Sequence, residues 1–349
     1  MRRGCSHAIQ SNPRATLRRG AFHYEEGLMP QGPIPVTVLT GFLGAGKTTL
    51  LRHMLEAEHG LKLAVIENEY SDTPIDSQLL GSEPVEVLTL ANGCVCCSIH
   101  VELEKALYLL LDKLDSGELA FDRLVIECTG LADPAPVAQT FFAGEEFCER
   151  YLLDGIITLV DAANAERHLQ ESVAQAQVGF ADRILLSKTD LVEAGAIEAL
   201  SQRLQRINRR APILTVAHGR IALAELLDIR GFNLDTELLT IASPRPLLPT
   251  ASQDRIATLV LRRERPLELN RISDFMEGLL ERHGDALLRY KGVLAVAGEP
   301  RRMVFQGVLR LYGFDWDARW HEDEARESVL VLIGDGLPEA EIRAGFAAL

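Results

Sequence analysis

Eight residues near the start of the chain have the types and spacing of a phosphate-binding loop. Residues 41–48, Gly-Phe-Leu-Gly-Ala-Gly-Lys-Thr, match the pattern G-x-x-x-x-G-K-[ST]. Glycines let the backbone N–H groups converge on phosphate oxygens, and the helix expected next adds its positive end. We expect Lys47 to reach the β- and γ-phosphates and Thr48 to bind Mg²⁺. The residues expected to contact nucleotide here are Gly41, Phe42, Leu43, Gly44, Ala45, Gly46, Lys47, Thr48 and Thr49.

An acidic residue closes a later apolar segment. Glu127 follows Leu-Val-Ile at residues 124–126, where a Walker-B acid would end its strand. Its carboxylate is expected to bind Mg²⁺ or to orient the attacking water, which makes Lys47, Thr48 and Glu127 the candidate catalytic residues. Gly130, three residues on, is expected to offer its N–H to the γ-phosphate. Such an acid is a weak signal alone, and the phosphate loop upstream strengthens it.

The four residues Ser-Lys-Thr-Asp at 187–190 follow another expected strand. A carboxylate at Asp190 can accept hydrogen bonds from guanine N1–H and the 2-amino group together, a pair of donors that adenine lacks. The stem of Lys188 can lie over the base. The alternative is an ordinary solvated loop. The position and order of the motif favour guanine, so GTP is preferred over ATP and a kinase or ATPase is disfavoured.

Three cysteines crowd into residues 94–97, Cys-Val-Cys-Cys, at the start of an expected helix. A helix N-terminus favours thiolates, and closely spaced thiolates suit Zn²⁺ or a similar ion. A carboxylate from residues 67–72 is a further candidate ligand. A redox switch and inert thiols are the two alternatives to a metal site.

Composition limits the class of protein. At 349 residues the chain has room for about two domains. A net charge of -14 argues against general nucleic-acid binding, and no apolar run approaches the length of a membrane span. Six cysteines are too few for a disulfide scaffold, so we expect a reducing, cytoplasmic location with no nucleic-acid or membrane partner.

Short β-branched apolar segments alternate with helical ones from residue 34 to about residue 230. This alternation predicts an α/β fold of the P-loop NTPase type, a largely parallel sheet with helices on both faces. The expected strands are 35–40, 62–67, 85–90, 123–127, 155–160, 183–186 and 212–216; the clearest expected helices are 47–59, 101–113, 165–178 and 194–206. At or just past the strand ends lie Gly41, Glu67, Asn92, Glu127, Asp161 and Lys188. Ligands of such folds bind at that edge.

The ends of the chain differ from this pattern. Residues 1–33 carry five arginines and two glutamates, and we expect a disordered extension, with Met29 as a possible true start and a transit peptide as the alternative. Residues 34–241 form the expected nucleotide-binding domain and the proline-rich residues 242–254 a linker. Residues 255–349 predict a small α+β domain with strands 255–261, 293–297, 303–308 and 328–333 and helices 271–283 and 339–347.

Together with Ile-Glu-Asn-Glu at 66–69 and Glu-Cys-Thr-Gly-Leu-Ala-Asp-Pro at 127–134, these motifs resemble the CobW/YjiA family of metal-binding P-loop GTPases. The resemblance covers residues 34–349. It implies a slow GTPase that uses Mg²⁺ with GTP and binds Zn²⁺, Co²⁺ or Ni²⁺. Its role would be that of a metallochaperone with a client metalloprotein, or of a factor in metal homeostasis. The metal ligands that it implies are Glu67, Asp72 and Cys96, with Cys94 and Cys97 in the same motif and Glu104 as a weaker candidate.

The sequence departs from that family in three places. Ser71-Asp72 replaces the usual Gly-Glu, which shortens one carboxylate. Ser187 replaces the Asn that often opens the guanine motif, so we expect an amide tie to the phosphate loop to be lost. The 242–254 linker holds no His, which disfavours bulk metal storage.

The leading hypothesis is that nucleotide state controls metal release. The loop 67–72 is expected to contact the γ-phosphate and Mg²⁺ and also to bind the transferred metal, so hydrolysis would change one ligand set. The alternative is a non-catalytic sensor that binds nucleotide and metal without turnover.

Overall fold

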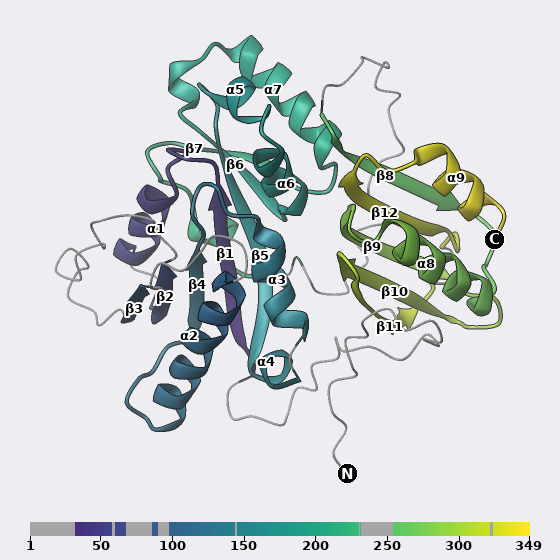
Figure 1. Cartoon of the computed structure of the whole chain (residues 1–349), viewed down its shortest axis with the longest axis horizontal. Coiled ribbons are helices and arrows are strands. Elements are labelled where there is room, and N and C mark those ends of the chain that lie inside the picture. Colours follow the sequence, from purple (N-terminus) through teal and green to yellow (C-terminus); the bar gives the residue numbers. More distant parts are fainter. Residues whose placement is uncertain are drawn as a thin grey trace.

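The computed structural model describes residues 32–57, 60–67, 86–89, 98–143, 145–229, 231, 254–321 and 324–349. Among these residues, seven strands form the parallel sheet that the sequence predicts, and their order is β3-β2-β4-β1-β5-β6-β7 (Figure 1). The strands are β1 (Ile34–Gly41), β2 (Leu63–Glu67), β3 (Glu86–Thr89), β4 (Arg123–Glu127), β5 (Tyr151–Asp161), β6 (Arg183–Ser187) and β7 (Ile213–Val216).

Helices cover both faces of this sheet. They are α1 (Lys47–Glu56), α2 (Ser98–Asp115), α3 (Pro134–Ala143), α4 (Glu145–Arg150), α5 (Ala165–His168), α6 (Ser172–Phe180) and α7 (Ala194–Ile207). Leu50 of α1 packs in the core on one face, and Leu107 of α2 and Leu204 of α7 pack in the core on the other. No helix in the described part of the chain is long and apolar enough to cross a bilayer.

Two helical regions differ from expectation. The single helix expected at 165–178 is wrong: Glu171 is extended, with φ −84° and ψ 132°, and separates α5 from α6. Helix α3 is not among the helices named from the sequence, although the sequence holds its start signal. Asp133 accepts a hydrogen bond from the Ala135 N–H at 2.9 Å, and Pro134 is the first helical residue.

The second part of the chain forms an antiparallel five-stranded sheet within the described residues, in the order β11-β10-β9-β12-β8. Its elements are β8 (Ile256–Arg263), α8 (Leu269–His283), β9 (Leu287–Ala295), β10 (Arg301–Val308), β11 (Leu311–Arg319), β12 (Ser328–Asp335) and α9 (Glu339–Ala347). Strand β11 was not expected. Phe314 of β11 is buried in the core with α8 and α9. Trp320, which follows the strand, is buried in a smaller cluster.

The two sheets share buried contacts through α6. Ile256, Leu288 and Ile333 of the small sheet belong to the same hydrophobic core as α6 and α7. A Cβ atom at Gly179 would lie 3.2 Å from side-chain carbons of Ile256 and Leu288, so the glycine allows this close approach. Of the expected linker 242–254, only Asp254 lies within the described residues.

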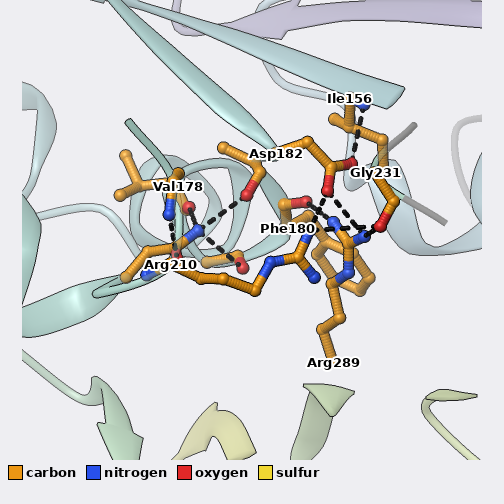
Figure 2. A network of polar contacts seen from close by, with 11 residues as sticks. Ile156, Val178, Phe180, Asp182, Arg210, Gly231 and Arg289 are labelled. Atoms are coloured by element: carbon orange, nitrogen blue, oxygen red, sulfur yellow. Dashed lines mark hydrogen bonds and ion pairs between the residues drawn. The ribbon is translucent and has the colours of Figure 1, made fainter. Parts of the chain in front are cut away.

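A buried ion cluster closes the junction (Figure 2). Asp182 pairs with Arg289 of β9 at 2.7 Å and with Arg210, and it accepts a hydrogen bond from the Ile156 N–H at 3.0 Å. Arg289 also donates to the carbonyl oxygens of Phe180 and Gly231, at 2.9 and 2.7 Å. The carboxylate is therefore tied to both parts of the chain.

We predict that Asp182→Asn destabilises the protein by about 3–5 kcal/mol, because removing one partner of a buried pair leaves buried charge uncompensated. Urea denaturation followed by circular dichroism measures the loss. Glu339→Gln breaks an exposed i,i+4 pair with Arg343 and serves as the control that leaves the midpoint unchanged.

The stability contributed by the Asp182 carboxylate should depend on pH. Burial raises the pKa of Asp182, but the charges of Arg289 and Arg210 outweigh it and hold the pKa below its usual value. A folded pKa below the unfolded one means stability that is present above the unfolded pKa, about 3.9, and lost as pH falls through the folded pKa. As the pH falls through that range, the difference in free energy of unfolding between wild type and Asp182→Asn should shrink. A difference that stays constant with pH would contradict the assignment.

Candidate functional site

The phosphate loop continues the central strand β1. Gly41 has φ +137°, and a Cβ atom there would lie 2.4 Å from the Leu159 carbonyl oxygen of β5. Gly46, with φ +101°, adopts the left-handed conformation that opens α1. The loop closes with a hydrogen bond from the Ala45 N–H to the Phe42 carbonyl at 3.1 Å. Glycine is required at Gly41 by both space and backbone angle, and at Gly46 by the backbone angle.

Lys47 lies inside the loop rather than on its surface. Its side chain is buried, and Nζ donates to the carbonyl oxygens of Gly41 at 2.9 Å and Phe42 at 3.4 Å. The ammonium group is thus held at the centre of the loop, where it is suited to meet phosphate charge.

Thr48 and Glu127 connect the loop to β4. The Thr48 hydroxyl donates to Glu127 Oε1 at 2.9 Å, and the carboxylate is buried at the end of its strand. These oxygen donors are of the kind that Mg²⁺ prefers, so the pair fits the ion expected with the nucleotide. Burial raises the pKa of the next residue, Cys128, to about 12, and its side chain lies in the core of the sheet domain.

Gly130 lies directly against the phosphate loop. A Cβ atom at this position would be 2.6 Å from the Leu43 backbone nitrogen, so the close approach requires glycine. The structure thus brings Lys47, Thr48, Glu127 and Gly130 together, as the sequence predicts for their places in the fold.

The Ser187–Asp190 segment lies at the same sheet edge. Lys188 has the left-handed φ of 55°, and its Nζ donates to Asp161 Oδ2 at the end of β5, at 2.7 Å. Burial raises the pKa of Asp161, but hydrogen bonds from Lys188 and Asn164 reverse this and lower it below its usual value. Asp190 is exposed in a 3-10 turn, Thr189–Leu191, where its carboxylate is accessible to a base.

Ser187 has no side-chain amide, as expected, but its hydroxyl takes over the tie to the phosphate loop. Its hydroxyl donates to the Ala45 carbonyl of the phosphate loop at 2.7 Å. A tie between the guanine motif and the phosphate loop therefore exists in this chain, made by a hydroxyl instead of an amide. A shorter side chain suffices because β6 ends close to the loop, across β5.

Three residues of this region escape sequence reasoning. The buried ring of His168 contacts the Phe42 ring, with centroids 4.5 Å apart. Gly219, after β7, packs so closely on α1 that a Cβ atom would lie 2.8 Å from the Thr49 carbonyl oxygen. Gln177 of α6 hydrogen-bonds the loop that holds Gly130. Each contact joins distant segments, although Gly219, three residues after the end of β7, was a usable turn signal.

The expected metal ligands are only partly described. Glu67 is buried at the end of β2, and Glu104 is half-buried on α2. Outside the described residues lie Asp72, Asn92, Cys94, Cys96 and Cys97. Among the side chains that the structure describes, no three His, Cys, Asp or Glu form a group that could hold a metal ion.

Comparison with known proteins identifies relatives of both parts of the chain. Residues 35–215 match the CobW/HypB/UreG nucleotide-binding domain, and residues 256–349 match the cobalamin synthesis protein CobW C-terminal domain. The zinc chaperone YjiA of Escherichia coli K12 is 54% identical over 91% of this chain and 99% of its own length. The zinc chaperone CobW of Pseudomonas aeruginosa PAO1 is 32% identical over 94% of this chain and 95% of its own.

A solved structure agrees with these matches. The crystal structure of Zn(II)-bound YjiA GTPase from E. coli superposes with a TM-score of 0.80 and 50% identity, covering 91% of this chain and 99% of that one. With matching domains over both sheets and relatives that span nearly their full length, the chain belongs to the CobW/HypB/UreG family of nucleotide-binding proteins.

Proposed function

We propose that this protein is a GTP-hydrolysing zinc chaperone in which the bound nucleotide sets the affinity for the metal. The names of its relatives, zinc chaperone and zinc-regulated GTPase metalloprotein activator, support GTP and Zn²⁺ as ligands. Slow turnover, binding of Co²⁺ or Ni²⁺ and delivery to a client metalloprotein are parts of the same proposal. Zn²⁺ is its cargo, and Mg²⁺ accompanies GTP.

One observation carries the coupling between the two ligands. Glu67 and Glu127 are register partners on the neighbouring parallel strands β2 and β4. The backbones of such neighbouring strands lie about 4.8 Å apart. Register partners point to the same face, and both residues are buried. Glu127 holds the Thr48 hydroxyl of the phosphate loop, while Glu67 begins the segment that leads to Asp72. A change at one carboxylate is therefore felt by its neighbour.

The chain's own groups have distinct tasks in hydrolysis. Lys47 and the loop N–H groups bind the phosphates and balance the charge that develops in the transition state. Thr48 and Glu127 would hold the Mg²⁺ that accompanies GTP, and the ion would supply further charge neutralisation. Gly130 offers its N–H to the γ-phosphate, and the Glu127 carboxylate orients the attacking water. The motifs contain no Arg to stabilise transition-state charge and no Gln to orient the attacking water, which is why turnover is expected to be slow.

Base selection follows from the other end of the site. Asp190 is exposed in its turn, and the turn is held by two ties: Lys188 to Asp161, and Ser187 to Ala45. A carboxylate presented from a fixed turn can accept both guanine donors at once. Adenine offers no such pair of donors, so the arrangement supports GTP.

A non-catalytic sensor is the second candidate, and phosphate release separates the two. We expect wild type to release phosphate from GTP faster than from ATP, at a rate that Zn²⁺, Co²⁺ or Ni²⁺ alters. Lys47→Ala should abolish release, because the phosphate charge loses its main cation. GTP binding without any release above the Lys47→Ala blank would favour the sensor.

We predict that Asp190→Asn weakens GTP binding by about 1.4–4 kcal/mol, since an acceptor pair for guanine is lost. Isothermal titration with GTP and ATP measures the change. Glu193→Gln, which removes an exposed carboxylate three residues away, should leave both affinities unaltered. Equal affinity of the wild type for ATP and GTP would show that Asp190 does not select the base.

The metal ligands are tested with Co²⁺, because thiolate ligation produces a strong near-ultraviolet charge-transfer band. We expect the band in wild type, its loss in Cys96→Ala, and a metal affinity that differs between GDP and a GTP analogue. Cys128→Ala is the control, since that thiol is buried in the core and should contribute nothing to the band. A band that survives Cys96→Ala would refute the ligand assignment, and equal metal affinity with both nucleotides would refute the coupling.

A further inference from the structure

Helix α6 carries two buried glutamines that serve different partners. Gln175 and Gln177 are 4% and 1% exposed, and neither residue is among the motifs of the nucleotide site. A buried amide is costly unless its polar atoms are satisfied, so their hydrogen bonds identify what each side chain holds in place.

Gln177 holds the loop that follows β4. Its Nε2 donates to the carbonyl oxygens of Gly130 at 3.2 Å and Ala132 at 3.0 Å. Two carbonyl acceptors require a group with two donor hydrogens, and an amide NH₂ is such a group. The backbone carbonyl oxygen of Gln177 accepts a hydrogen bond from the buried Thr158 hydroxyl at 2.7 Å, which fixes this turn of α6 to β5. The amide therefore extends from a fixed point to both ends of the three-residue segment Gly130–Ala132.

This segment reaches the reacting end of the site. It begins three residues after Glu127, and Gly130 lies against the Leu43 backbone of the phosphate loop. The phosphate loop is expected to bind GDP and GTP alike, whereas the Gly130 N–H is proposed above to meet the γ-phosphate, which GDP lacks. The orientation of the Gly130 peptide therefore affects GTP and the transition state more than GDP.

We propose that Gln177 is a positioning residue for GTP hydrolysis, holding Gly130–Ala132 in the conformation that presents the Gly130 N–H to the γ-phosphate. This inference rests on the proposed GTPase function. Gln177 touches neither nucleotide nor water in this role and acts through the loop. A fixed donor saves the cost of ordering the loop in each cycle.

Gln175 provides a matched control on the same helix. Its Oε1 accepts the N–H groups of Arg255 at 2.9 Å and Ile256 at 3.2 Å, and its Nε2 donates to the Leu169 carbonyl at 2.9 Å. These bonds serve the junction with the small sheet. Substitution at Gln175 removes a buried amide of the same type without touching the Gly130 loop.

The experiment compares Gln177→Met and Gln175→Met in the full-length protein. Affinities for GDP and for a non-hydrolysable GTP analogue are measured with Mg²⁺, together with kcat and KM for GTP. For Gln177→Met we expect the analogue to bind about tenfold more weakly, GDP binding to change less than about twofold, and kcat to fall. Gln175→Met should lower the melting temperature while the ratio of analogue to GDP affinity stays that of wild type.

Two results would overturn the proposal. One is that Gln177→Met weakens the binding of GDP and of the GTP analogue equally. The other is that Gln175→Met changes the ratio of analogue to GDP affinity as much as Gln177→Met does. Either would assign Gln177 a merely structural role. If Gln177→Met does not fold, Gln177→Asn, with an amide one methylene shorter, is measured in its place under the same criteria. Failure of the wild type to bind or hydrolyse GTP is a separate result that refutes the proposed function itself.

Discussion

The lack of space at the end of strand β1 is the constraint on which the rest of the site depends. This strand lies between β4 and β5, and at its end a Cβ atom on Gly41 would lie 2.4 Å from the Leu159 carbonyl oxygen. Glycine alone fits there, and the turn that it makes leads directly into the phosphate loop and α1. Because all the strands of this sheet are parallel, β4 and β5 deliver Glu127 and Asp161 to the same edge.

Much of the large sheet follows from the sequence because its strands are buried on both faces and read as continuous apolar segments. Strand β4 occupies the predicted residues 123–127. Strand β5 begins at Tyr151, four residues before the predicted start. The acidic Asp154 is a residue type that strands usually avoid, so the sequence pattern places the start after it. In the fold Asp154 is buried and pairs with Arg123 at 2.8 Å, and no local pattern reveals such compensation.

The site divides in the same way. Local motifs predict where Lys47, Thr48 and Glu127 lie, because each follows directly from a strand end. Contacts between distant segments are invisible at that level. The Ser187 hydroxyl reaches Ala45 across 142 residues, and a rule based on Asn at that position misses it. The expected ligands Asp72, Cys94, Cys96 and Cys97 lie outside the described residues and stay predictions.

The close packing at Gly179 has a consequence for how the protein loses its structure. Side chains of β8, β9 and β12 belong to the same buried core as α6 and α7, and Asp182 is neutralised partly from β9. Each part has a core of its own, but the shared core and the Arg289 pair belong to neither part alone. We therefore expect melting of the small sheet to remove packing from α6, the helix that borders the nucleotide edge.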